Sequence, residues 1–404
     1  MSTSEQAARR ARSYARSSSS SSLRRQKTRF SLFSIGKGID VPFVLLIFVL
    51  LAVGITMMFS ASYPNAYYYQ GDSYYYLKRQ LLFAAIGIAI MFAVSFLDYH
   101  YYHRFAAVIL GASYVALVLV LFMPAVNGVH RWIGVGTFGI QASEISKFAI
   151  ILFLAHWGSR YYDRMDTFRY GVVPGLGVFA STALLLLLEP HYSCIVIIAL
   201  LTVIMLFVSG IRMKWIVIGG VGLAFIVILL WVTGMLSYAM ERMEGWGQAL
   251  VVDRSSELWD TTWQTRNSLY AIGSGGLFGL GLGQSRQKYL YLPEPQNDFI
   301  FAIVCEELGL VGAVIILLIF ALLVWRGVII SLRARDRFGK LLGIGLIAHI
   351  GLQVILNILV ITDWLPNTGI SLPFFSYGGS SLLMLMFEMG VVLSVSRSAN
   401  IEKS

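Results

Sequence analysis

The sequence predicts an all-α polytopic membrane protein, with about ten transmembrane helices and one long extracytoplasmic loop. Of the 404 residues, 57% are hydrophobic and only 13% are charged, whereas soluble domains carry roughly 25% charged residues. Apolar segments of about 20 residues, the length that crosses the hydrocarbon core of a bilayer, recur along the chain. These observations exclude an ordinary soluble domain and place most of the chain in lipid.

Residues 1–40 precede the first apolar segment and are polar, with a run of serines and many Lys and Arg. They contain no apolar core of the signal-peptide type. We expect a disordered cytoplasmic tail whose basic side chains contact lipid headgroups. Anionic lipid and the charge bias of membrane loops then explain the net charge of +10 better than nucleic-acid binding does.

Ten apolar segments between residues 41 and 396 are long enough to be transmembrane helices. The fourth and fifth are the least regular, because they are short or contain Pro174 and several glycines. The predicted spans cover residues 41–61, 80–97, 105–124, 142–158, 170–188, 193–209, 214–233, 298–325, 340–362 and 378–396.

The distribution of positive charge predicts the orientation in the plasma membrane. With the N-terminus inside, the tail and alternate short loops hold most of the 31 Lys and Arg residues. Cytoplasmic loops carry such an excess, so both termini, including residues 397–404, are predicted to be cytoplasmic. The loop of residues 234–297 then faces outside, and loops of this length tend to be functional.

This extracytoplasmic loop contains two notable features. Trp246, Trp259 and Trp263 are aromatic residues suited to the headgroup level of a membrane. Residues 271–285 are rich in glycine, which permits tight turns and close approach of the backbone to a ligand. The stretch lacks the Gly-Lys-Ser/Thr ending of a P-loop, so it does not match that phosphate-binding motif.

A single carboxylate, Asp298, stands where the polar stretch 288–297 gives way to the apolar eighth span. Aspartate is a favoured helix N-cap, and the positive end of the helix dipole favours its ionised form. Position alone therefore leaves two interpretations of Asp298 at the outer membrane boundary. It is an ordinary helix cap, or it is a general base that acts on a substrate anchored in lipid.

Ionisable residues inside the spans are costly to bury and are therefore functional candidates. Glu144 and Lys147 are three residues apart on one face of the fourth span. Either they pair with each other, or Lys147 adds positive charge to a cavity that receives an anionic headgroup. Arg131 is placed just outside this span and would assist in the second case.

The last three spans hold further polar residues. Glu306 and Glu307 point to opposite sides of the eighth span, and one of them is expected to pair with another helix. Gln353 and Asn357 are predicted interhelical hydrogen-bonding residues, and Glu388 is predicted to be a structural partner. Residues 357–381 are rich in Pro, Gly and hydroxyl groups, so we expect a re-entrant turn that lines a cavity open to the outside.

Several of these stretches, taken together and in order, resemble the SEDS family of shape, elongation, division and sporulation proteins. The residues before Arg131, V-N-G, favour its FtsW/SpoVE branch. The matching stretches are S-A-S (60–62), R-W-I (131–133), Q-A-S-E-I-S-K (141–147), A-I-G-S-G-G (271–276), Y-L-P-E-P-Q-N-D-F-I-F-A (291–302), E-E-L-G (306–309) and L-P-N-T-G-I-S-L-P-F-F-S-Y-G-G-S-S (365–381).

The resemblance implies a peptidoglycan glycosyltransferase that polymerises lipid II for division, elongation or sporulation, together with a class B penicillin-binding protein. Asp298 matches the essential aspartate of the family, and Glu144 and Lys147 match its intramembrane pair. Catalysis is assigned to Asp298, and the candidate substrate-binding residues are Lys147, Glu144, Arg131, Lys288, Gln284, Ser376, Ser380 and Thr368.

Three positions depart from the family pattern. Ala142 replaces a proline, His191 replaces an aspartate after Glu-Pro, and Leu290 stands where an acidic residue is common. The missing carboxylate at His191 puts the role of that position in doubt. None of the three departures affects Asp298.

The predicted mechanism has Asp298 deprotonate the acceptor sugar hydroxyl. Lys147, Arg131 or a divalent cation, Mg²⁺ or Mn²⁺, would stabilise the leaving pyrophosphate, and the metal requirement is left open. Direct displacement implies inversion and β-1,4 linkages. Two other functions remain open at this point: a lipid II flippase without chemistry, and a scaffold that recruits the penicillin-binding protein.

Overall fold

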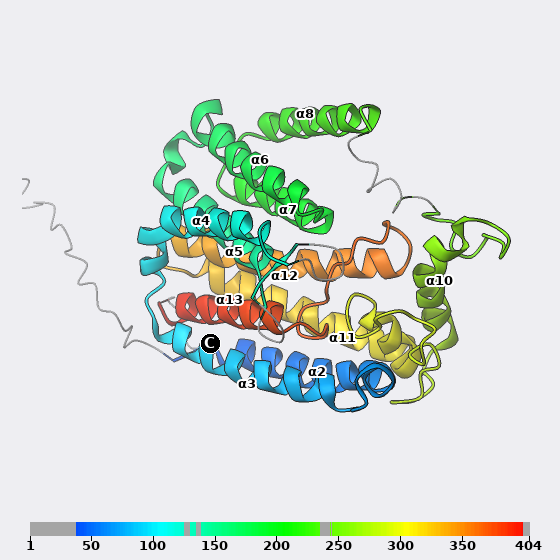
Figure 1. Cartoon of the computed structure of the whole chain (residues 1–404). Helices are drawn as coiled ribbons and strands as arrows, with labels where there is room; N and C mark the ends of the chain where they lie inside the picture. The colour runs from blue at the N-terminus through cyan, green and yellow to red at the C-terminus, as the bar shows by residue number, and fades with distance from the viewer. Residues whose placement is uncertain (1–37, 125–129, 135–138, 235–242, 244, 399–404) are drawn as a thin grey trace, which may run out of the picture. The chain divides into compact units, whose positions relative to one another are not determined.

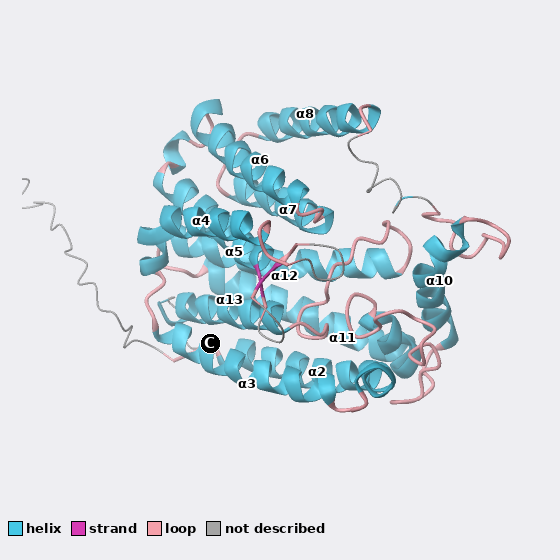
Figure 2. Cartoon of the chain, in the orientation of Figure 1, coloured by secondary structure: helices cyan, strands magenta, loops and turns pink. Residues whose placement is uncertain are grey.

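A computed structural model of the protein describes residues 38–124, 130–134, 139–234, 243 and 245–398. The predicted tail of residues 1–40 lies almost wholly outside these residues. The described chain is mainly helical, as Figures 1 and 2 show. Its helices are α2 (Val41–Gln70), α3 (Tyr75–Phe96), α4 (His100–Val120), α5 (Ala142–Arg160), α6 (Val173–Leu188), α7 (Tyr192–Val208), α8 (Met213–Val232), α10 (Leu258–Ser274), α11 (Ile300–Leu332), α12 (Arg337–Ile361) and α13 (Gly379–Ser398).

Each predicted span contains one of these helices, which confirms the all-α polytopic class. Among the described residues, 7 helices are long and apolar enough to cross a membrane: α2, α3, α4, α11, α12, α13 and the helix of Phe168–Leu188, which includes α6. Helix α7 and the first part of α8 are apolar but shorter. Helix α5 falls short because Glu144 and Lys147 interrupt its apolar sequence.

The predicted extracytoplasmic loop contains a helix, α10, that the sequence analysis did not anticipate. In Figure 1 it runs across the direction of the long helices and lies beside the start of α11. Its buried face includes Arg266, whose guanidinium lies 3.5 Å from the Trp259 ring centroid and donates to the Ala249 carbonyl at 2.7 Å. Because this face is polar, the hydropathy of the segment does not predict a helix.

Helix α11 is broken at Gly309, where φ is 68° and ψ is −173°. The glycine-rich stretch fills the break: the Leu280 amide donates to the Glu306 carbonyl at 2.9 Å, and the Val311 amide donates to the Leu277 carbonyl at 3.1 Å. A Cβ atom on Gly279 would lie 2.1 Å from the Glu307 carbonyl oxygen. The glycines therefore let the backbone of the glycine-rich stretch approach α11 closely. It hydrogen-bonds to the amide and carbonyl groups that have no helical partner at the break.

Charged residues mark one end of the bundle. Asp40 caps α2 and binds Arg326 at 2.7 Å, and Asp336 caps α12. Asn357 lies about 20 residues further along α12, which corresponds to roughly 30 Å, the thickness of a hydrocarbon core. Since Asn357 Nδ2 donates to the Asp298 carbonyl at 2.7 Å, Asp298 lies at the opposite membrane boundary from Asp40 and Asp336.

The segment 362–378 between α12 and α13 has no helix and enters the bundle, as predicted for a re-entrant turn. Phe374 and Phe375 are buried and pack against Phe320 of α11. A Cβ atom on Gly54 of α2 would lie 2.4 Å from the Phe374 carbonyl oxygen, so only glycine permits this approach. The turn is held inside the protein, where non-helical backbone at membrane depth is tolerated.

Candidate active site

A cavity of about 460 Å³ lies at the end of the bundle where Asp298 is found. Its lining comes from strands β1 (Trp132–Ile133) and β2 (Ile140–Gln141), from helices α3, α5, α7 and α12, from the residues before α11 and from the segment that leads into α13. Its polar lining consists of Arg79, Arg131, Gln141, Glu144, Lys147, His191, Ser193, Asn297, Asp298, Gln353, Ser371, Tyr377, Ser380 and Ser381.

Asp298 is partly exposed to this cavity. The predicted N-cap role is wrong: α11 begins at Ile300, its N-cap is Phe299, and no side chain caps it. Tertiary hydrogen bonds hold the Asp298 backbone instead, from Asn357 Nδ2 to its own carbonyl and from Ser376 Oγ to the Asn297 carbonyl, both at 2.7 Å. These bonds hold Asp298 in the lining of the cavity.

Gly369 lies against the Asp298 carboxylate. Its φ is +70°, and a Cβ atom there would be 3.0 Å from Asp298 Oδ2. We expect Gly369→Ala to lower the catalytic rate about tenfold, because strain and crowding displace the carboxylate. The rate of product formation tests this, with Gly111→Ala as the control, since nothing lies within 4 Å of that position. Equal rates for both variants would contradict the assignment.

Glu144 and Lys147 form the predicted ion pair, with Lys147 Nζ 2.8 Å from Glu144 Oε1. Both side chains are buried, and both line the cavity. The pair lies in the first two turns of α5, where the helix dipole favours the glutamate. The two earlier interpretations are therefore compatible, because Lys147 is paired and also contributes its charge to the cavity wall.

Arg131 lines the cavity beside a buried carboxyl group. Its guanidinium donates to the Pro190 carbonyl at 2.6 Å. Glu189, just after α6, is 1% exposed, and neither of its carboxyl oxygens has a hydrogen-bond partner among the described residues. Burial raises the pKa of Glu189 to about 8, although nearby Arg131 lowers it in part. Glu189 should therefore hold a proton near neutral pH.

This raised pKa predicts a pH-dependent stability. Between about pH 5 and pH 8 the unfolded Glu189 carboxyl is ionised while the folded one is protonated, so stability falls as the pH rises. Glu189→Gln removes this loss, and its free energy of unfolding should exceed the wild-type value by on the order of a few kcal/mol at pH 8. The difference should shrink towards pH 5. Unfolding of the purified protein at both pH values tests this, with exposed Glu257→Gln as control; a constant difference would disprove it.

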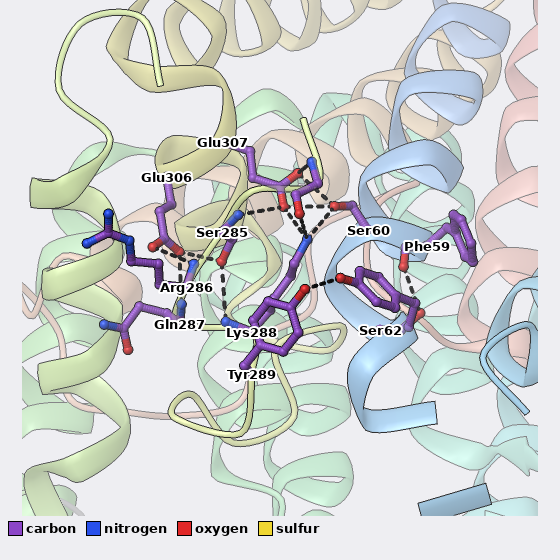
Figure 3. Close-up of polar contacts among 12 residues, drawn as sticks. Phe59, Ser60, Ser62, Ser285, Arg286, Gln287, Lys288, Tyr289, Glu306 and Glu307 are labelled. Atoms are coloured by element: carbon purple, nitrogen blue, oxygen red, sulfur yellow. Dashed lines mark hydrogen bonds and ion pairs between the residues drawn. The ribbon is translucent and has the colours of Figure 1, made fainter. Parts of the chain in front are cut away.

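A second polar cluster, the Lys288 cluster, lies between α2, the glycine-rich stretch and α11 (Figure 3). Lys288 Nζ is 2.8 Å from Glu307 Oε1, and both side chains are 0% exposed. Lys288 also donates to Ser60 Oγ at 3.2 Å and to the Gly283 carbonyl at 2.7 Å. The prediction that Lys288 binds substrate is corrected accordingly: complete burial in this ion pair gives it a structural role.

Glu306 completes the Lys288 cluster from the other side of α11. Its carboxylate accepts from the Arg286 amide at 3.0 Å and from the Ser285 hydroxyl. Both glutamates thus have partners: Glu307 bonds across to Ser60 of α2, and Glu306 holds the glycine-rich stretch. The sequence left open which of the two pairs with another helix. In the structure both do, because Glu306 also accepts from the hydroxyl of Ser274 at the end of α10, at 3.4 Å.

Three further predicted substrate-binding residues do not line the cavity. Gln284 is exposed in the glycine-rich stretch. The Ser376 hydroxyl donates to the Asn297 carbonyl at 2.7 Å, and the Thr368 carbonyl accepts from the Ser193 hydroxyl. The prediction that these three residues line the substrate cavity is therefore corrected. Neighbours of Thr368 and Ser376 line it, whereas no residue close to Gln284 in the sequence does. Ser380 does line it.

The sequence analysis missed Arg79, which lines the cavity and lies 4.0 Å from the Tyr75 ring centroid. A signal was present, because Arg79 and Arg131 are among the few basic residues on the predicted outer side, against the usual charge bias. Positive charge at that boundary indicates an anionic ligand. Asp298, Lys147, Arg131 and Arg79 are therefore brought to one cavity from four separate parts of the chain.

A divalent cation was left open as a cofactor. Among the described residues, no group of three or more His, Cys, Asp or Glu side chains is arranged to hold a metal ion. The cavity carboxylates are Asp298 and Glu144, and Glu144 already binds Lys147. The cavity therefore does not fit a metal centre held by protein ligands alone. Mg²⁺ commonly binds through one or two carboxylates plus substrate phosphates.

Comparisons with known proteins agree with this geometry. The family model described as "Cell cycle protein", of FtsW, RodA and SpoVE, matches residues 42–401. Stage V sporulation protein E of Bacillus subtilis (strain 168) is 42% identical over 89% of this chain and 97% of that protein. The probable peptidoglycan glycosyltransferase FtsW of Trichlorobacter lovleyi is 35% identical over 88% of this chain and 93% of its own length.

Solved structures show the same fold. A chain from a study of how a peptidoglycan synthase complex coordinates polymerization and crosslinking matches with a TM-score of 0.73 at 25% identity, over 90% of this chain and 99% of that one. The crystal structure of Thermus thermophilus rod shape determining protein RodA matches with a TM-score of 0.66 at 25% identity, with the same coverage. The chain therefore belongs to the FtsW/RodA/SpoVE family of cell cycle proteins, the SEDS family, and is FtsW/SpoVE-like.

Proposed function

We propose that this protein is a peptidoglycan glycosyltransferase that polymerises lipid II into β-1,4 glycan strands at the outer face of the plasma membrane. The observation that carries the proposal is the cavity in which Asp298 faces Lys147, Arg131 and Arg79 at one membrane boundary. A base beside several cations suits a reaction that deprotonates a sugar and releases a pyrophosphate. The names of relatives such as FtsW support the same activity.

In the proposed step, the Asp298 carboxylate accepts the proton of the acceptor sugar hydroxyl. The hydroxyl oxygen forms a bond to the anomeric carbon of the lipid-linked donor sugar. The bond from that carbon to the pyrophosphate oxygen breaks, and the pyrophosphate leaves with the electron pair. One displacement inverts the anomeric carbon, which yields a β-linkage from an α-linked donor.

The cations of the cavity stabilise the charge that develops on the leaving pyrophosphate. Lys147 is buried in the cavity wall, whereas Arg131 and Arg79 are partly exposed. We infer that the three cations share the two phosphates between them. A pyrophosphate needs no proton to leave, which explains why a second acidic catalyst is unnecessary, in contrast to glycoside hydrolysis. The proposed divalent cation, Mg²⁺ or Mn²⁺, would arrive with the substrate phosphates, and no step is assigned to it.

A class B penicillin-binding protein is the proposed partner, because glycan strands must be cross-linked after they form. A solved relative belongs to a peptidoglycan synthase complex, which supports this partnership. Both chain termini are proposed to be cytoplasmic, on the side of Asp40 and Asp336 and opposite the cavity. Sporulation and division are the settings suggested by the names of the relatives.

The test is polymerisation of purified lipid II by the purified protein, with the penicillin-binding partner and no other polymerase present. Glycan strands longer than the disaccharide are expected, with Mg²⁺, Mn²⁺ and a chelator compared in parallel. A flippase would move labelled lipid II across a vesicle membrane without forming strands, and a scaffold would do neither. Either of these results would overturn the proposal.

A further inference from the structure

A second, smaller cavity, the inner cavity, lies deeper in the bundle than the substrate cavity. It has a volume of about 20 Å³ and is formed mainly by α5, α12, α13 and the re-entrant turn. A cavity of about 10–15 Å³ by this measure is enough for one water molecule. Its polar lining includes Glu144, His349, Gln353, Ser381 and Glu388. It is therefore large enough and polar enough to hold a single water.

Two of the lining residues form a buried pair at the middle of the membrane. His349 Nδ1 lies 3.0 Å from Glu388 Oε2, and the two side chains are 4% and 0% exposed. His349 lies halfway along α12 and Glu388 halfway along α13, so each is far from both membrane boundaries. Ionisable groups at this depth are costly unless their polar atoms are satisfied.

The pair leaves two polar atoms unsatisfied by protein. His349 Nε2 and Glu388 Oε1 have no hydrogen-bond partner among the described residues, although both residues line the inner cavity. Buried polar atoms in native proteins are nearly always hydrogen-bonded, to protein or to ordered water. One water in contact with both atoms would give each of them a hydrogen-bond partner.

Glu144 lies where the inner cavity meets the substrate cavity. It lines both of them, and its Oε1 binds Lys147 at 2.8 Å. The His349–Glu388 pair lines the same inner cavity as Glu144. A water in the inner cavity would therefore lie between Glu144 and this pair.

We propose that the inner cavity is a binding site for one ordered water that bridges Glu144 to the His349–Glu388 pair, and that His349 and Glu388 are positioning residues for Lys147. When a pyrophosphate takes Lys147 as its counter-ion, Glu144 loses that partner. The bridging water, held by His349, then supplies Glu144 with a replacement hydrogen bond. The positioning role of His349 and Glu388 rests on the proposed function, whereas the water site does not.

The first test concerns the water itself. An experimental map of the full-length protein in lipid nanodiscs, at a resolution that shows ordered waters, should contain a peak within hydrogen-bond distance of His349 Nε2 and Glu388 Oε1. Ordered side chains around a cavity without such a peak would overturn the proposal. This result is independent of catalysis, so it stands or falls separately from the glycosyltransferase assignment.

The second test measures the affinity of the folded protein for undecaprenyl pyrophosphate in nanodiscs. His349→Leu should weaken binding about tenfold, the effect of one hydrogen bond to a charged group. His349→Gln, which can still hydrogen-bond to the water, should restore most of the affinity. The matched control is His156→Leu, which removes a partly buried histidine of α5 outside both cavities.

In polymerisation assays the same loss should appear in the KM for lipid II, with kcat changed much less. A purely structural role would lower kcat together with the amount of folded protein, and glutamine would not rescue it. Unchanged affinity in His349→Leu, or an equal loss in His156→Leu, would overturn the positioning role. If strands do not form at all, the pyrophosphate affinity still decides this proposal.

Discussion

Replacing Asp298 with asparagine is expected to reduce glycan polymerisation by about 10² to 10⁴-fold, the usual contribution of a general base. The amide has nearly the same shape as the carboxylate but cannot accept the sugar proton at neutral pH. Asn357 and Ser376 hold the main chain at this position, and the substitution leaves those contacts in place. We expect the variant to fold and still to bind lipid II.

The measurement is the initial rate of strand formation with purified protein, partner and lipid II, beside a thermal unfolding curve. Asp363→Asn is the matched control, because Asp363 lies at the same end of the bundle but lines a different surface pocket. That control should retain activity within about twofold, as is usual for a change outside the site. A folded Asp298→Asn protein that works at the wild-type rate would disprove the assignment of the base.

The largest expected effect on stability comes from breaking the Lys288–Glu307 pair. Lys288→Met keeps the length of the side chain but leaves the Glu307 carboxylate buried without its cation. Removing one partner of a buried ion pair costs roughly 3–5 kcal/mol. The bonds from Ser60 and the Gly283 amide remain, so we expect the lower part of that range, and a looser contact between α2 and α11.

Unfolding by denaturant in detergent measures this effect. The double variant Lys288→Met/Glu307→Gln should recover much of the lost free energy, because no unpaired charge remains. Lys78→Met is the control: its partner Asp72 is 39% exposed and Lys78 is 69% exposed, so the loss should be below about 1 kcal/mol. A double variant as unstable as the single one would show that packing, and not charge, dominates.

The spanning helices could be predicted because lipid leaves the backbone no other choice. A chain in the hydrocarbon core must satisfy its own amides and carbonyls, so hydropathy alone locates the helices. The same rule explains the failure at α10: its buried side chains are polar, Arg266 among them, and its fold depends on contacts with Trp259 and the Ala249 carbonyl. No local pattern encodes such contacts.

The charged residues show the same contrast between local patterns and tertiary contacts. The Glu144–Lys147 pair could be predicted because helix geometry places residues three apart on one face. Lys288 was misassigned because its partner, Glu307, lies 19 residues further along the chain, and no local pattern pairs the two. The N-cap prediction for Asp298 failed because Asn357, from a different helix, holds its backbone in place.

By itself the sequence determined the membrane class, the order of the apolar helices, the family resemblance and the acidic residue at the start of the eighth apolar segment. These features follow from composition, from helical periodicity and from motifs, all of which are local. Only the tertiary structure decided that Asp298, Lys147, Arg131 and Arg79 share one cavity, while Lys288 lies buried elsewhere. The physical reason is that a charge in a membrane protein is stabilised by partners from other helices, and their packing is a property of the whole fold.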